Sequence, residues 1–136
     1  MVFDDCNVDH VASLLDIGIK RLCKFPIIFP AFSIIPGNQQ SVFLTPTINQ
    51  GLIDVQKSLY DLLIENGYST RKHYRLHNWL PHCSISKELS PKEAQKTLEV
   101  CLNFATIRET LVTKIGFIEF RPRKVIKTIC LADSNN

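Results

Sequence analysis

The stretch Trp79-Leu80-Pro81-His82-Cys83-Ser84-Ile85-Ser86 places an imidazole and a hydroxyl two positions apart, directly after a proline. Side chains in a β-strand alternate between its faces, so the sequence predicts a strand over residues 81–87 with His82 and Ser84 on one face. An imidazole can give or take a proton, and a hydroxyl can donate a hydrogen bond to a phosphoryl oxygen. The pair therefore predicts a phosphate-binding site. Cys83 falls on the opposite face, where we expect a buried thiol.

Helices are predicted on both sides of this strand. Ser90 as N-cap, Pro91 at the first helical position and Glu93 form a capping box for a helix that continues to about Phe104. That helix is expected to bury Ala94, Leu98, Cys101 and Leu102.

Two more helices are predicted upstream from the spacing of apolar residues. They cover residues 8–23, with Asn7 as N-cap, and residues 52–63, with Thr47 or Asn49 as N-cap and a stop at Gly67. Residues 68–78 show no clean period and are predicted to form a loop.

Strands account for the remaining apolar segments. Residues 25–35 contain Pro26 and Pro30, which favour an edge or irregular strand, and residues 36–38 form a turn into a returning strand at 42–44. Strands are also predicted over 110–120 and 125–131. The resulting order of helix, hairpin, helix, strand, helix and two strands predicts an α+β fold with an antiparallel or mixed sheet.

Length and composition indicate one folded domain over residues 1–136, because 45% of the residues are hydrophobic and 21% are charged. The five cysteines are odd in number and lack a C-x-x-C pair, which argues against a disulfide framework and against a zinc site. Asp4 and Asp5 have no partner at metal-ligand spacing, and we expect no metal or other cofactor.

No apolar run approaches the roughly 20 residues of a membrane span, and the start lacks a signal peptide, so we expect a cytoplasmic protein without a membrane partner.

Positive charge is concentrated just before the His82 strand, although the net charge is only +3. Such a cluster would favour an anionic ligand near His82; a solvated basic loop is the alternative, and DNA readout is not indicated. Its members are Arg71, Lys72, His73, Arg75 and His77.

Four further residues are candidates for substrate binding. Arg75 and Lys87 are suited to contact a phosphate, with an ordinary surface role as the alternative. Tyr74 and Trp79 are suited to stack on a base, and for Trp79 a structural role beside Pro81 is the competing interpretation.

The segment Trp79-Leu80-Pro81-His82-Cys83-Ser84-Ile85 resembles the second signature of the two-histidine phosphoesterase superfamily, the 2′-5′ RNA ligase-like proteins. The surroundings are similar as well: a strand like residues 41–46, a helix like residues 52–63, and a later strand like residues 115–120. The resemblance covers nearly the whole chain, from about Asp4 to Leu131.

The resemblance implies a bilobal α+β fold in which each lobe contributes one H-x-T/S motif to a central cleft. It implies metal-independent hydrolysis of a nucleotide or RNA end that carries a 2′,3′-cyclic phosphate or a 2′-5′ linkage. By position, His82 would be one catalytic general acid or base, and Ser84 would bind the phosphate. Imidazole suits either proton-transfer role near neutral pH.

The first H-x-T/S motif of that family is absent from this sequence. His10 is followed by Val11 and Ala12, and neither His73 nor His77 has a hydroxyl two positions later. Three explanations remain open. In the first, a longer form carries the motif upstream of Met1, and this chain is N-terminally truncated relative to the family. In the second, the chain binds without turnover. In the third, two chains in a homodimer bring their His82 residues together.

Two alternatives to an enzyme follow. The first is a non-catalytic nucleotide-binding or RNA-binding module built on the same fold. The second is an interaction domain, for which an exposed apolar patch is expected at Phe25, Phe29, Phe32 and Phe43.

Overall fold

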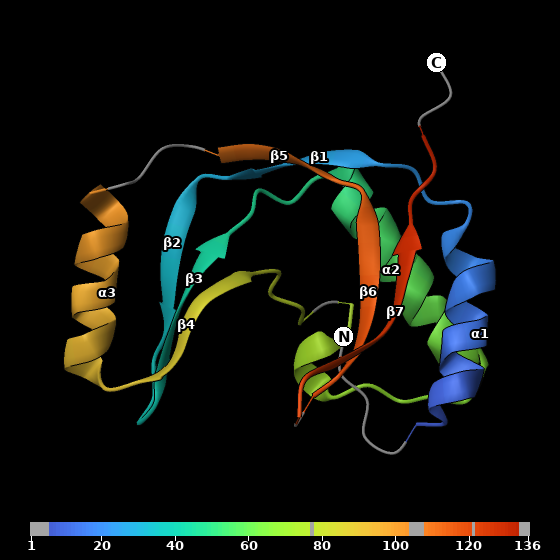
Figure 1. The fold of residues 1–136 in the computed structure, drawn as a ribbon, viewed down its shortest axis with the longest axis horizontal. Helices are drawn as coiled ribbons and strands as arrows, with labels where there is room; N and C mark the ends of the chain where they lie inside the picture. The colour runs from blue at the N-terminus through green and yellow to red at the C-terminus, as the bar shows by residue number, and fades with distance from the viewer. Residues whose placement is uncertain (1–5, 77, 104–107, 121, 134–136) are drawn as a thin grey trace. The chain divides into compact units, whose positions relative to one another are not determined.

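The computed structural model describes residues 6–76, 78–103, 108–120 and 122–133. In this part of the chain the fold is α+β, as the sequence predicts. Within two of its sheets, neighbouring strands run antiparallel (Figure 1). The chain divides into two compact units. Unit 1 contains Met1–Pro26, Asn49–Leu80 and Leu111–Asn136, and unit 2 contains Ile27–Ile48 and Pro81–Thr110.

Two helices form much of unit 1. Helix α1 (Val8–Ile19) begins after Asn7, whose side chain accepts a hydrogen bond from the His10 amide, and α2 (Gln50–Glu65) begins after Asn49 in the same way. The structure thus selects Asn49 over Thr47 as the cap of the second helix. Helix α2 ends just before Gly67, where the positive φ of 82° suits a residue without a Cβ atom.

The core of unit 1 lies where these helices meet a β-hairpin. Strands β6 (Lys114–Glu119) and β7 (Lys124–Cys130) pair antiparallel, and α1 packs against both α2 and β7. Burial of apolar side chains from all these elements stabilises the unit. The buried cluster consists of Val11, Leu15, Ile19, Phe25, Leu63, Ile129 and Leu131.

Unit 2 is built on a three-stranded antiparallel sheet. Its order is β2 (Ala31–Ile35), β3 (Gln40–Thr45) and β4 (Cys83–Leu89), so β3 is the central strand. The predicted hairpin is β2 and β3, and the turn between them contains Gly37 with a positive φ of 156°. The predicted strand of the His82 segment is β4, which begins one residue after His82.

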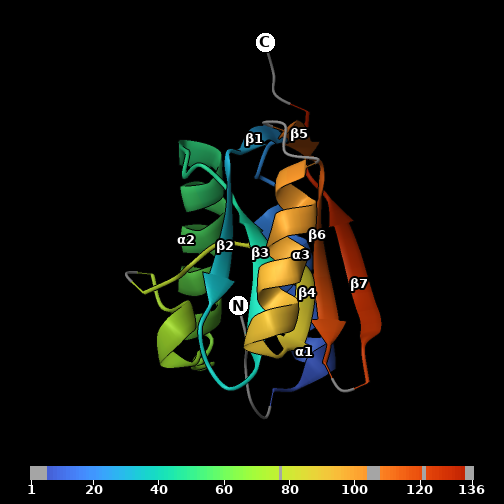
Figure 2. The same ribbon diagram turned by 90° about the vertical axis from the view of Figure 1, so that its left-hand side faces the viewer.

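Helix α3 (Pro91–Asn103) lies against the β2–β3–β4 sheet of unit 2 (Figure 2). Its predicted capping box is present, because the Ser90 amide donates to Glu93 Oε2 at 2.8 Å and the Ser90 hydroxyl donates to the same oxygen at 2.6 Å. The first of these hydrogen bonds, together with that from the Glu93 amide to the Ser90 hydroxyl oxygen at 3.4 Å, satisfies backbone donors that a helix start otherwise leaves open. Ala94 is fully buried, as predicted.

The capping box should make the start of α3 less stable in acid. The hydrogen bond from the Ser90 hydroxyl, followed by that from its amide, lowers the pKa of the Glu93 carboxyl from its ordinary value. The folded state therefore holds this proton less tightly than the unfolded state, so the stabilisation is present above about pH 4.3 and is lost as the pH falls through the lowered pKa. We expect Glu93→Gln to remove this component of the acid dependence, measured as the unfolding midpoint against pH. An identical acid profile in Glu93→Gln would contradict this expectation.

Several element boundaries differ from the sequence-based predictions. The first helix ends at Ile19 rather than Cys23, and the segment 25–35 forms two strands, β1 (Phe25–Phe29) and β2, separated by Pro30. The segment 110–120 likewise divides into β5 (Arg108–Val112) and β6, with β5 paired to β1. Proline cannot donate to a strand ladder, which explains the first division. The predicted helix end at Phe104 lies outside the described residues.

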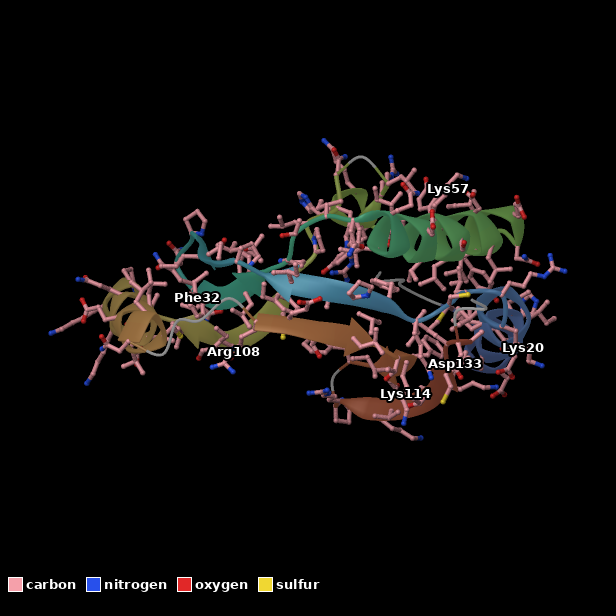
Figure 3. All side chains as sticks on the ribbon, turned by 90° about the horizontal axis from the view of Figure 1, so that it is seen from above. Lys20, Phe32, Lys57, Arg108, Lys114 and Asp133 are labelled. Atoms are coloured by element: carbon pink, nitrogen blue, oxygen red, sulfur yellow. The ribbon has the colours of Figure 1, made fainter. Side chains whose placement is uncertain are left out.

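Three burial predictions are wrong. Leu102 is 58% exposed in the last turn of α3, and Cys83 is exposed at the first position of β4, an edge strand of its sheet. The expected exposed phenylalanine patch is absent: Phe25 and Phe43 are buried, and Phe29 and Phe32 are half-buried. Phe32 is labelled on β2 in Figure 3.

Within the described residues, no helix has the length and apolar character that crossing a membrane requires.

Candidate functional site

His82 lies directly before β4 in unit 2, Ser84 is the second residue of that strand, and both side chains are exposed. Ser84 pairs with Phe43 of the central strand, and Cys83 pairs with Leu44. The alternation of side chains in this register places His82 and Ser84 on the face that Phe43 occupies, as the sequence predicts. Both groups of the predicted phosphate site are therefore accessible from the same side of one sheet.

The Phe43 ring lies against the His82 imidazole. The two ring centroids are 5.1 Å apart, with an angle of 53° between the ring planes. Tilted arrangements at this separation are favourable for aromatic pairs. Because Phe43 is only 2% exposed and is held between two neighbouring strands, it provides a fixed surface for an exposed histidine.

A β-bulge follows Ser84 in β4. The pairing changes from Phe43 with Ser84 to Val42 with Ser86, so that one extra residue, Ile85, lies between them. Ser86 consequently shares the face of Val42, opposite Ser84. Lys87 follows on β4 and is exposed, at the point where the pairing with β3 shifts a second time, between Ser86 and Leu89.

The other predicted substrate-binding residues belong to unit 1. Tyr74 ends a short 3₁₀ helix at Lys72–Tyr74 and is half-buried, Arg75 is exposed, and Trp79 is half-buried. The structure places them in the predicted loop between α2 and the His82 segment. It assigns His82, Ser84 and Lys87 to one unit and these three residues to the other. His77, a member of the basic cluster, lies outside the described residues.

The basic loop is anchored to α2 by a buried amide. Gln56 is 6% exposed, and its Nε2 donates to the backbone carbonyl of Tyr74 at 3.1 Å. Backbone hydrogen bonds from Tyr74 to Arg71 and from Asn78 to Arg75, both 2.9 Å, hold the turns on either side. These contacts fix the backbone that carries the exposed cationic side chains.

Replacing this amide should loosen the loop. In Gln56→Leu the half-buried Tyr74 carbonyl loses its donor, and a lost intramolecular hydrogen bond costs about 0.5–1.5 kcal/mol. We expect faster hydrogen exchange at residues 71–78 with little change at α3, whose contacts are separate. Lys57→Ala is the matched control, since the Lys57 side chain is exposed on the same helix and pairs with Asp61. Equal exchange in the two variants would contradict the anchoring role of Gln56.

His10 is the histidine in α1, and the structure gives it a structural contact. Its Nδ1 shares a hydrogen bond of 2.7 Å with the hydroxyl of Tyr68, which links α1 to the residue that follows the end of α2. Because it lies in a helix, it lacks the alternating geometry of an H-x-T/S motif. Among the described residues, no group of three or more His, Cys, Asp or Glu side chains could hold a metal ion. Asp4 and Asp5 lie outside the described residues.

Sequence reasoning missed three residues on the face of His82. Phe43 contacts the imidazole, and Ser33 and Thr45 share a hydrogen bond of 2.6 Å between their hydroxyls. Ser33 pairs with Phe43, which in turn pairs with Ser84, so a single row crosses all three strands. The alternation of Phe43 and Thr45 in the sequence could have indicated a shared face, but their relation to His82 depends on the register, which the sequence does not reveal.

The arrangement can hold an anion and move a proton beside it. The Ser84 hydroxyl, which has no hydrogen-bond partner in the described part of the chain, can donate to an anionic oxygen. The neighbouring imidazole can donate to the same ligand or exchange a proton with it.

No family model matches the chain, and no curated protein matches it either.

Proposed function

We propose that the chain binds the phosphoryl group of a nucleotide or RNA end at His82 and Ser84, and that it acts there as a metal-independent phosphoesterase of the two-histidine kind. The ligand carries a 2′,3′-cyclic phosphate or a 2′-5′ linkage. The observation that carries the proposal is the exposure of His82 and Ser84 on one face of β4, with the imidazole packed against the buried Phe43 ring. The resemblance of residues 79–85 to the second family signature supports the choice of substrate.

The chemistry of such a step needs one proton donor and one proton acceptor. Water forms a bond to phosphorus, the bond from phosphorus to one ribose oxygen breaks, and that oxygen receives a proton while the attacking water loses one. His82 supplies one of these two roles, and Ser84 binds a non-bridging oxygen as negative charge develops. The bilobal arrangement of the family belongs to the proposal, with unit 2 as the lobe that carries this motif.

A binding function without turnover is the second candidate, and the histidine content of unit 2 favours it. His82 is the single histidine in the sequence of that unit, since His10, His73 and His77 belong to unit 1. One imidazole with one hydroxyl is sufficient to bind a phosphate but fills only one of the two proton-transfer roles. Binding and turnover therefore have to be measured separately.

Binding is tested with adenosine 2′,3′-cyclic phosphate by isothermal titration calorimetry at low salt. Ser84→Ala removes a hydrogen bond to a charged group, which contributes about 1.5–3 kcal/mol, so the dissociation constant should rise about 10-fold to 100-fold. Adenosine without phosphate should bind equally to both proteins.

Ser86→Ala is the matched control, since it deletes a hydroxyl from the same strand on the opposite face. We expect it to bind like the wild type. The proposal is wrong if the wild-type chain binds neither the cyclic nucleotide nor a 2′-5′-linked dinucleotide, or if Ser84→Ala and Ser86→Ala have the same effect.

A further inference from the structure

The paired hydroxyls of Ser33 and Thr45 lie beside the proposed phosphate site. Ser33 is on β2 and Thr45 is at the end of β3, and their oxygens are 2.6 Å apart. Both residues are half-buried. They belong to unit 2, the unit that holds His82 and Ser84.

The register of the sheet places this pair on the face of His82. Ser33 pairs with Phe43, and Phe43 pairs with Ser84, so these three side chains point to the same side. Thr45, two residues after Phe43, shares that side. The ladder of β3 with β4 ends at the pair of Leu44 and Cys83, and Thr45 and His82 are the next residues along each segment, so alternation places both on the face of Phe43.

The proton count of the pair leaves one donor available. Each hydroxyl carries one proton, and a single proton makes the hydrogen bond between the two oxygens. In the described part of the chain, neither hydroxyl has a second partner. When Ser33 donates to Thr45, the Thr45 proton is available to an acceptor that comes from outside the chain.

We infer that Thr45 is a second phosphate-binding residue and that Ser33 positions its hydroxyl. The inference rests on the proposed function and extends it. Thr45 and Ser84 are diagonal positions on adjacent strands, about 7–8 Å apart, and the Phe43–His82 ring pair forms the other diagonal, so a phosphoryl group that bridges the two hydroxyls would lie over that ring pair. A cyclic phosphodiester has two non-bridging oxygens. Ser84 binds one of these oxygens and Thr45 binds the other. His82 then exchanges a proton with the ester oxygen.

Thr45→Val tests the inference, because valine keeps the shape of threonine and lacks its hydroxyl. The probe is adenosine 2′,3′-cyclic phosphate, titrated into the full chain. We expect the dissociation constant to rise about 10-fold to 100-fold, the loss typical of a hydrogen bond to a charged group. The affinity for adenosine should stay unchanged, whereas general damage to the sheet would weaken both ligands.

Ser33→Ala tests the positioning role through a double-mutant cycle. Alone it should weaken binding less than Thr45→Val, and in the Thr45→Val background it should have no further effect, because Ser33 acts through Thr45. Fully additive losses would overturn the positioning role. Ser41→Ala is the control: it deletes a hydroxyl from β3 about 13 Å along the strand and should leave binding unchanged.

The outcomes separate this inference from the proposed function. If Ser84→Ala weakens binding of the cyclic nucleotide while Thr45→Val does not, the proposed function stands and the role of Thr45 is wrong. If the wild-type chain does not bind the cyclic nucleotide, both are wrong. If Thr45→Val and Ser41→Ala weaken binding equally, the effect belongs to the strand rather than to the Thr45 hydroxyl, and the inference is overturned.

Discussion

His82→Ala should lower the rate of hydrolysis of adenosine 2′,3′-cyclic phosphate by about 10² to 10⁴, the contribution typical of a side chain that transfers a proton in the transition state. Alanine leaves the strand intact because His82 is exposed and precedes β4. The rate is measured at saturating substrate by separation of the cyclic nucleotide from the ring-opened product. The Michaelis constant should change much less than the turnover number, since Ser84 remains to bind the phosphate.

His10→Ala is the matched control for this experiment. It removes an imidazole that contacts Tyr68 in unit 1, and it should leave the rate unchanged. Hydrolysis that persists in His82→Ala would rule out the proton-transfer role. A wild-type chain that binds the cyclic nucleotide and shows no hydrolysis would establish the binding function as the correct one of the two.

Phe43→Ala should destabilise the protein by about 3–5 kcal/mol, the usual cost of deleting a buried phenylalanine side chain. The side chain is 2% exposed and lies on the central strand of the unit 2 sheet, where collapse of the resulting cavity is restricted. For a chain of this length the loss corresponds to a fall in melting temperature of about 10–20 °C. Because the ring also contacts His82, the imidazole should lose its fixed position.

Leu102→Ala provides the comparison for stability. This leucine is 58% exposed on α3, and its replacement should change the free energy of unfolding by less than about 0.5 kcal/mol. Phe43→Leu separates the two roles of the phenylalanine, since it fills most of the volume but removes the aromatic contact. A normal melting temperature in Phe43→Ala would show that the ring is not part of the core of unit 2.

Local signals in the sequence predicted most elements of the fold. Asn7 and Asn49 cap their helices, Ser90 and Glu93 form the expected box, and Gly67 follows the end of α2 because each of these features depends on residues three or four positions apart. Burial was predicted less well. Cys83 is apolar and alternates correctly, yet it is exposed because its strand lies at the edge of a sheet, and strand order is a property of the whole chain.

The candidate site also combines features that the local sequence predicts with features that depend on the whole fold. The common face of His82 and Ser84 follows from alternation along one strand, so the sequence alone predicts it. The contact with Phe43 and the proximity of Thr45 depend on the pairing of β3 with β4, about forty residues away, and on the bulge after Ser84. Register is set by tertiary packing, and a single sequence gives no direct measure of it.

The bulges in β4 also affect how copies of this chain can meet. An exposed edge strand is a template for strand addition, and regular edges promote aggregation. In β4 the pairing with β3 shifts twice, and Glu88 adopts a left-handed conformation with φ of 59°, so the outer edge is irregular over its second half. The exposed charges of Lys87 and Glu88 lie in this half. A homodimer formed by continuous β4–β4 pairing along the whole strand is therefore disfavoured.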